Sequence, residues 1–120
     1  MWGRYSDLDR ISAFLELVMA EGYLYILASG RDGLLYTGAT TDVYMRMVRH
    51  RDEGHAGYAG KRGILRLVYV ERHDSIEAAI AREKLMKKWK RAWKVALIEK
   101  SNPEWAELWV DYRGGDFLQK

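Results

Sequence analysis

The chain has 120 residues, of which 48% are hydrophobic and 31% are charged. This length fits one domain around one core, and this balance is typical of a globular protein rather than a disordered one. The absence of cysteine excludes a disulfide scaffold, a thiolate metal site and a cysteine nucleophile. No apolar run approaches the roughly 20 residues that a membrane span needs, so we expect a cytoplasmic protein without a membrane partner. The formal net charge of +3 permits an anionic partner without requiring one.

Residues 1–21 form an N-terminal extension in which apolar residues recur at helical spacing. The residues that would share one side of this helix are Leu8, Ile11, Leu15 and Val18, with Phe14 beside them. The extension carries acidic as well as basic residues, so it is not predicted to be a nucleic-acid arm. Two interpretations stay open: a helix that packs on the domain or on a partner, or a preamble to a natural start at Met19.

Residues 22–38 predict two short strands joined by a glycine turn. Aromatic and aliphatic β-formers alternate over residues 23–27, and both faces of this strand are apolar, so the sheet is expected to be covered on both sides. Residues 29–33 (Ser-Gly-Arg-Asp-Gly) have the composition of a turn, and residues 34–38 form the return strand of a hairpin. Gly38 ends that strand, where it indicates a bulge or a close approach of neighbouring atoms.

A helix is predicted from about residue 43 to residue 53, with a side chain of the preceding segment as its cap. The candidate caps are Thr40, Thr41 and Asp42, and the residues expected to face inward are Tyr44, Met45 and Val48. Arg46 and His50 are four apart on this helix and therefore share a face. A solvated basic face is the ordinary interpretation of Arg49 and Arg51. The pair Arg46 and His50 stands out because it follows a strand that ends in glycine.

Residues 54–63 are a glycine-rich loop that lacks the GxxxxGK[ST] pattern of a nucleotide P-loop. The loop is either an ordinary connector or a substrate-contacting segment, in which Lys61 and Arg62 would lie near phosphate. Residues 64–71 follow as a third strand, which joins the hairpin in a small sheet.

A long helix is predicted from Asp74, which forms a capping box with Glu77. Apolar residues line one face of this helix, and Glu83 lies among them at the same spacing. These apolar residues are Ile76, Ala79, Ile80 and Met86. A carboxylate in an apolar stripe is costly unless it is paired or bound to a metal. The position of Glu83 fits an ion pair with Lys87, four residues on, and a metal ligand equally well.

The main concentration of positive charge in the chain lies at residues 84–94. Three of its lysines continue the Glu83 face and are predicted to contact phosphate. They are Lys87, Lys90 and Lys94. Trp89 and Trp93, interleaved with them, suit either a stacking surface or the core, and we expect them mostly in the core.

The helical pattern ends at Asn102 and Pro103. The residues expected to close the core after this break are Trp105, Leu108 and Trp109. Residues 113–120 are expected to form a flexible tail. The predicted domain is therefore 22–112, between the extension and the tail.

The order of these residues resembles the GIY-YIG endonuclease domain. Two three-residue motifs, here called words, give the family its name. The first word corresponds to Tyr23-Leu24-Tyr25 and the second to Tyr36-Thr37-Gly38. The family's arginine and histidine correspond to Arg46 and His50, and its metal-binding glutamate corresponds to Glu83. Each word alone is weak, whereas the ordered set with the basic run is fairly specific. The likeness covers roughly residues 22–109 and is closest to small stand-alone bacterial members. It implies an α/β fold with a small three-stranded, mostly antiparallel sheet flanked by helices, here with an extra N-terminal helix.

The resemblance implies a metal-dependent endonuclease that hydrolyses phosphodiester bonds in DNA, with Mg²⁺ or Mn²⁺ on Glu83. Arg46 would hold the phosphate, and Tyr36 would activate or position water. Tyr25 would orient that water or help to bind phosphate, and His50 could accept the proton of Tyr36. A free tyrosine has a pKa of about 10, so a base at neutral pH needs a cation beside it. The general base is left open among these two tyrosines and His50.

The chain departs from the family pattern in three places. Neither word is literal, and Ala39 stands where many members carry a lysine beside the second word. Asn102 fits only loosely the late asparagine that helps to place phosphate or metal-bound water. Gly38, by its place in the second word, is also expected beside the nucleic acid.

These departures make a catalytically weak nucleic-acid-binding module on the same fold the alternative to a nuclease. A partner-binding protein would explain the N-terminal helix but not Glu83. The length leaves no room for a separate sequence-reading domain, so selectivity is expected for DNA structure such as branches, flaps or damaged sites. The resemblance suggests repair or recombination. The residues do not decide whether the substrate is DNA or RNA, or whether the protein is a monomer or a homodimer.

Overall fold

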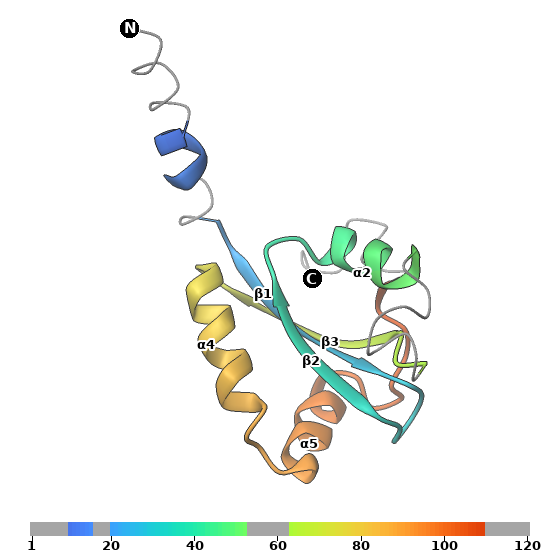
Figure 1. Cartoon of the computed structure of the whole chain (residues 1–120). Coiled ribbons are helices and arrows are strands. Elements are labelled where there is room, and N and C mark those ends of the chain that lie inside the picture. The colour runs from blue at the N-terminus through green and yellow to red at the C-terminus, as the bar shows by residue number, and fades with distance from the viewer. Residues whose placement is uncertain (1–9, 16–19, 53–62, 110–120) are drawn as a thin grey trace, which may run out of the picture.

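The computed structural model describes residues 10–15, 20–52 and 63–109 (Figure 1). The elements in chain order are β1 (Gly22–Ala28), β2 (Leu35–Thr40), α2 (Val43–Asp52), β3 (Arg66–His73), α4 (Ile76–Met86) and α5 (Arg91–Ser101). A short helical segment at residues 10–15 precedes β1, as the sequence predicts. Among these described elements no helix is both long and apolar enough to cross a membrane. Residues 1–9 and 16–19 of the extension, the loop 53–62 and the predicted tail lie outside the described residues.

The three strands form one antiparallel sheet in the order β2-β1-β3, so β1 lies in the middle. Against β2, Tyr25 pairs with Gly38. Against β3, the register shifts after Ile26, which pairs with Tyr69, whereas the next residue pairs with Leu67. Val68 is therefore the extra residue of a β-bulge. The predicted three-stranded sheet is confirmed, although its third strand starts two residues later than expected.

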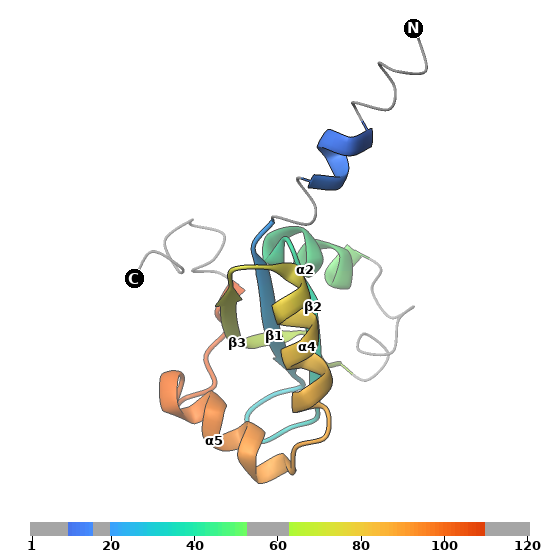
Figure 2. The same cartoon turned by 90° about the vertical axis from the view of Figure 1, so that its left-hand side faces the viewer.

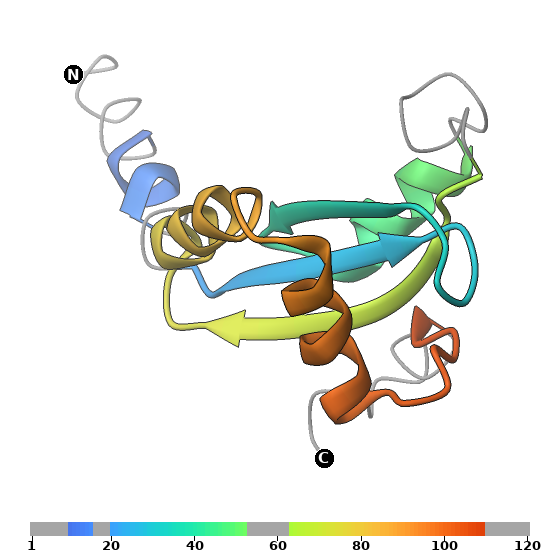
Figure 3. The same ribbon diagram turned by 90° about the horizontal axis from the view of Figure 1, so that it is seen from below.

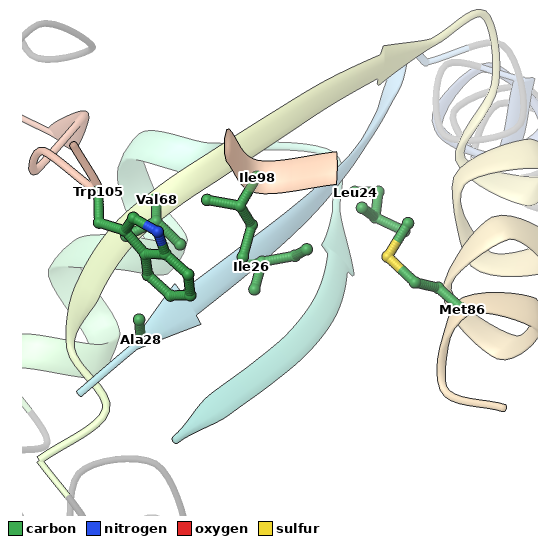
Figure 4. Close-up of a cluster of buried hydrophobic side chains, with 7 residues drawn as sticks. All are labelled: Leu24, Ile26, Ala28, Val68, Met86, Ile98 and Trp105. Atoms are coloured by element: carbon green, nitrogen blue, oxygen red, sulfur yellow. The ribbon is translucent and has the colours of Figure 1, made fainter. Parts of the chain in front are cut away.

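Helices cover both faces of the sheet: α4 and α5 lie against one face and α2 against the other (Figures 1, 2 and 3). Successive residues of a strand point to opposite faces, so the central strand contributes to two cores. The core under α4 and α5 consists of Leu24, Ile26, Ala28, Val68, Met86, Ile98 and Trp105 (Figure 4). The core under α2 consists of Tyr25, Leu27, Val43, Met47, Ile64 and Leu67. The expectation that β1 is covered on both sides is confirmed.

The helix α2 begins where the sequence predicts, and one of the three candidate caps is used. The Asp42 carboxylate Oδ1 accepts a hydrogen bond from the backbone N–H of Met45 at 3.0 Å. The predicted inward face is wrong, because Val43 and Met47 are buried, whereas Tyr44 and Met45 are 41% and 44% exposed. The helix is rotated by about one residue relative to the prediction.

The start of α4 also differs from the prediction. Ser75, not Asp74, is the N-cap residue, and its hydroxyl accepts a hydrogen bond from the N–H of Ala78 at 3.1 Å. Gly22 packs against this cap so closely that a Cβ there would lie 2.5 Å from the Cα of Ile76. The absence of a side chain at Gly22 therefore lets the first turn of α4 sit on the sheet.

The single long helix predicted from Asp74, with a pattern that runs on to Asn102, is wrong, because it is two helices. The first ends at Met86, where the N–H groups of Lys88 and Trp89 donate to carbonyls three residues back, at 3.1 and 3.0 Å. This tighter turn ends the helix, and Lys90 then has an extended backbone before α5 starts at Arg91. The break turns α5 back over the sheet, where Ile98 is buried.

One buried amide holds the segment after α5 to the sheet. The Nδ2 group of Asn102 donates to the carbonyls of Val68 and Ala106, both at 3.0 Å, and its Oδ1 accepts from the N–H of Ala106 at 3.0 Å. Val68 is the bulged residue, so the amide supplies a partner for a buried carbonyl. Trp105 is fully buried next to this turn, which confirms that it closes the core.

Two further contacts continue this attachment along the outer edge of β3. The carboxylate of Glu107 accepts a hydrogen bond from the N–H of Leu67 at 2.5 Å, and the N–H of Leu108 donates to the carbonyl of Leu67 at 2.8 Å. The same carboxylate forms an ion pair with Arg51 of α2. Glu107 therefore ties the C-terminal segment, the sheet and α2 together.

Candidate active site

The site is built around Tyr25, in the middle of the central strand. Its ring is 1% exposed and lies directly above Gly38 of the neighbouring strand. A Cβ at Gly38 would lie 2.4 Å from both Cζ and Oη of Tyr25, so only glycine leaves room for this ring. The Tyr25 hydroxyl consequently lies over β2, which is an edge strand of the sheet.

Three rings meet at this point. The centroid of Tyr25 lies 6.4 Å from that of Tyr36 and 6.1 Å from that of His50, and Tyr36 and His50 are 5.8 Å apart. The Oη of Tyr25 lies 3.3 Å from Nε2 of His50, and it donates to that nitrogen when the imidazole carries its proton on Nδ1. The structure thus brings together three of the predicted site residues from β1, β2 and α2.

Two charged residues act on the same hydroxyl. Burial raises the pKa of Tyr25 well above its ordinary value, Tyr36 raises it further, Arg46 lowers it and Glu83 raises it. Electrostatic effects of this kind fall off with distance, so Arg46 of α2 and Glu83 of α4 both lie near the Tyr25 hydroxyl. Three of the predicted site residues therefore meet as rings, namely Tyr25, Tyr36 and His50. The charges of the other two, Arg46 on α2 and Glu83 on α4, act on the Tyr25 hydroxyl.

Glu83 has a lysine partner in the structure. The Nζ of Lys87 lies 3.6 Å from Oε1 of Glu83, and the two side chains are 55% and 19% exposed. The ion pair that the sequence allows is therefore present. It is a loose contact with a flexible, exposed lysine, so it leaves the carboxylate able to take another cation.

Glu83 fits a hydrated Mg²⁺ or Mn²⁺ better than a fully protein-bound ion. In residues 10–15, 20–52 and 63–109, no three His, Asp or Glu side chains are grouped to hold a metal. A lone carboxylate suits Mg²⁺, because this ion keeps several of its waters, and oxygen ligands also suit Mn²⁺. It does not suit a closed zinc site, which takes four protein ligands.

The other predicted nucleic-acid residues are spread more widely. Lys90 and Lys94 lie around the start of α5, and Lys90 Nζ is 5.9 Å from the ring centroid of Trp93. Lys61 and Arg62 lie outside the described residues. The structure gives no support for phosphate binding by Asn102, because both amide hydrogens already donate within the fold.

The expectation that the tryptophans are mostly in the core holds for one and fails for the other. Trp89 packs partly buried against the core under α4 and α5, with the guanidinium of Arg82 4.9 Å from its ring. Trp93 is 54% exposed. The reason is the break between α4 and α5, which places the two tryptophans on different elements.

Sequence reasoning also missed a polar cluster that fixes α4 against β3. The Glu71 carboxylate accepts hydrogen bonds from the Tyr69 hydroxyl at 2.7 Å and from Arg82 at 3.0 and 3.3 Å, and lies 2.6 Å from His73 Nε2. The sequence does contain a signal for this cluster: residues 69, 71 and 73 alternate along the strand and therefore share one of its faces. Arg82 adjoins Glu83, so this cluster sets the rotation of the helix that carries Glu83.

The fold and this grouping of side chains define a class of protein. The model of the GIY-YIG catalytic domain matches residues 21–96, and the chain belongs to the GIY-YIG family, as its residue order predicts.

Within that family, the chain is similar to UPF0213 proteins. It is 43% identical over 79 residues to the UPF0213 protein of Streptococcus sanguinis, covering 66% of this chain and 90% of that one. It is 39% identical over 87 residues to the UPF0213 protein of Syntrophus aciditrophicus, covering 72% and 98%. The solution NMR structure of the UPF0213 protein BH0048 from Bacillus halodurans is 36% identical, with a TM-score of 0.44, covering 68% of this chain and 86% of that one.

Proposed function

We propose that this chain is a metal-dependent endonuclease that hydrolyses phosphodiester bonds in DNA. The observation that carries the proposal is the convergence of two tyrosines, a histidine, an arginine and a carboxylate on one edge of the sheet. Such a set supplies what the reaction needs, namely a water activator, a phosphate ligand and a site for a cation. The match to the GIY-YIG catalytic domain supports the same reaction class.

In this mechanism Arg46 holds a non-bridging oxygen of the phosphate through its planar guanidinium. Tyr36 gives its phenolic proton to His50, whose ring lies 5.8 Å from its own, and takes a proton from the attacking water as that water bonds to phosphorus. The bond from phosphorus to the leaving oxygen breaks in the same step. When bound at Glu83, the divalent cation supplies neutralising charge to the phosphate and to the leaving oxygen.

Tyr25 has an orienting role in this proposal rather than that of a base. Its ring is buried, and burial raises its pKa, so its hydroxyl keeps its proton at neutral pH. Its hydroxyl lies 3.3 Å from His50 Nε2. When it accepts a hydrogen bond from Nε2–H, it fixes the imidazole and leaves Nδ1 to receive a proton. Among the three candidate bases, this leaves Tyr36 and His50. The assignment predicts that Tyr36→Phe abolishes most cleavage; full activity in that variant would refute it.

A matched pair of variants on one helix tests the role of Glu83. Labelled branched and linear DNA is incubated with and without Mg²⁺ or Mn²⁺, beside Glu83→Gln and Glu77→Gln. Both changes remove one carboxylate from α4, but Glu77 is exposed in its first turn. We expect Glu83→Gln to lose metal-dependent cleavage by about 100-fold or more, and Glu77→Gln to cleave like the wild type. Equal cleavage by both variants would refute a metal site at Glu83.

A second candidate function is a nucleic-acid-binding module without cleavage. The ion pair of Glu83 with Lys87 favours it, because a carboxylate held by a lysine has less need of a metal. Ala39 favours it too, because it removes a cation from the neighbourhood of Tyr36. Salt-sensitive DNA binding with no cleavage under any divalent metal would establish this second function and refute the first.

A further inference from the structure

Trp93 is an exposed aromatic side chain in a stretch of chain whose charged residues are all lysines and arginines. Tryptophans in folded proteins are highly buried on average, yet Trp93 is 54% exposed. Its ring packs edge-on against Trp89, with the centroids 6.2 Å apart and an angle of 75° between the planes. Trp89 is anchored in the core under α4 and α5. One edge of Trp93 is therefore supported from below, while much of its ring faces solvent.

The stretch of chain around Trp93 carries only positive charge. Every charged residue from 84 to 98 is basic. These residues are Lys84, Lys87, Lys88, Lys90, Arg91 and Lys94. An exposed apolar ring among cations disfavours an apolar or basic protein partner and favours an anionic partner that also carries π-faces. Nucleic acid has both properties.

The platform that carries Trp93 is held in place. Arg91, two residues before it, donates to the carbonyls of Asp32 and Gly33 at 2.9 and 2.6 Å. These bonds fix the first turn of α5 to the turn between β1 and β2. A ring held on a fixed helix can stack with little loss of conformational entropy, which favours binding.

The basic stretch begins at the candidate active site. It includes Lys87, whose Nζ lies 3.6 Å from Oε1 of Glu83, and it continues along the chain to Trp93 through the connector between α4 and α5. A DNA strand that follows this stretch from a phosphate at Glu83 would meet lysines first and the indole next.

We propose that Trp93 stacks on an unpaired base of DNA, so that this surface selects substrates in which a single-stranded arm joins a duplex. The inference rests on the proposed function, because it places that arm beside the cleaved phosphate. Bases inside a duplex are stacked on both sides and have no free face, whereas an unpaired base offers its face to an aromatic side chain. The lysines around Trp93 would contact the phosphates of the same arm.

The test measures binding without cleavage. Fluorescence anisotropy in EDTA compares a labelled blunt duplex with the same duplex carrying an arm of about ten nucleotides. Trp93→Leu removes the aromatic face but keeps an apolar contact for Trp89, and Trp93→Phe keeps an aromatic face. Leu85→Ala is the matched control, because Leu85 is 56% exposed on α4 and has no ring. Thermal melting verifies that each variant is folded.

We expect Trp93→Leu to bind the armed DNA about 5- to 100-fold more weakly, and the blunt duplex within about twofold of the wild type. Trp93→Phe should retain most of the affinity for the arm, and Leu85→Ala all of it. Lys94→Ala should weaken binding of the armed DNA and reduce its salt dependence, because Lys94 contacts the phosphates of the arm in this proposal. If Trp93→Leu weakens both DNAs equally, or neither, stacking by Trp93 is refuted.

The two proposals fail separately. A wild-type protein that binds armed DNA through Trp93 but never cleaves with Mg²⁺ or Mn²⁺ would refute the nuclease and keep the stacking surface. Metal-dependent cleavage with the same affinity for armed DNA in wild type and Trp93→Leu would keep the nuclease and refute the stacking surface.

Discussion

Replacing Gly38 by alanine adds a single methyl group at the most crowded point of the candidate site. That methyl would lie 2.4 Å from Cζ and Oη of Tyr25, and 2.9 Å from Cε1. Carbon atoms in contact prefer about 3.5–4.0 Å, so the end of the ring must move by about 1 Å. The ring is 1% exposed and is enclosed by the core under α2, so the movement displaces its neighbours as well.

The size of the effect follows from two opposing terms. Forcing an extra methyl group into a packed core typically costs about 1–3 kcal/mol. Alanine in a strand recovers roughly 0.5–1 kcal/mol relative to glycine, because the unfolded chain loses fewer conformations. We expect Gly38→Ala to lower the free energy of unfolding by about 1–2 kcal/mol. A shift of about 1 Å in the Tyr25 hydroxyl should lower cleavage by about 100-fold, because orientation at a reacting centre is that sensitive.

Urea denaturation and cleavage of branched DNA measure the two effects, and the chain offers a matched control. A Cβ at Gly30 has nothing within 4 Å. Gly30→Ala should therefore leave stability within about 0.5 kcal/mol of the wild type or raise it slightly, with cleavage unchanged. In a Tyr25→Leu background the destabilisation by Gly38→Ala should largely disappear, because the clashing atoms are gone.

Stability and cleavage equal to those of the wild type in Gly38→Ala would refute this reasoning. It would mean that the ring of Tyr25 moves freely, and that its place over β2 does not matter for the chemistry.

Three further predictions concern the fold. Asn102→Ala should lower the free energy of unfolding by about 2–3 kcal/mol in urea, because the buried carbonyl of Val68 and the carbonyl and N–H of Ala106 lose their partner. Asp42→Ala, which removes the cap on the N–H of Met45, should lower it by about 1 kcal/mol. Burial raises the pKa of Glu71, but hydrogen bonds from its neighbours outweigh that effect and leave the pKa below 4.5. The ionised carboxylate therefore stabilises the fold above about pH 4.5, and the stability difference from Glu71→Gln should shrink as the pH falls below that value.

Much of the site could be predicted, because the local sequence pattern assigns most of its residues to a strand or to a helix face. Tyr25 and Tyr36 lie on predicted strands, and Arg46 and His50 share a helix face by spacing alone. That these four meet Glu83 follows from the family resemblance, because spacing within α4 says nothing about which strand edge the helix covers.

Sequence periodicity failed where tertiary contacts decide the outcome. The apolar stripe of α4 continues into α5 on a helical wheel, so the break after Met86 leaves little trace in the residue types. That break is the reason that Trp93 lies outside the core. The role of Asn102 could not be predicted either, because its partner is a bulged residue of β3, and the bulge depends on the register against β1.

The attachment of residues 102–108 to β3 has a consequence for the behaviour of the protein in solution. A three-stranded sheet exposes two strand edges, and unpaired edges are templates for aggregation. The side chains of Asn102 and Glu107 and the backbone N–H of Leu108 occupy backbone groups of residues 67 and 68. This segment therefore protects the β3 edge without adding a strand. The family match ends at residue 96. A fragment cut to the match would therefore keep the five side chains of the candidate site and yet expose an unpaired strand edge.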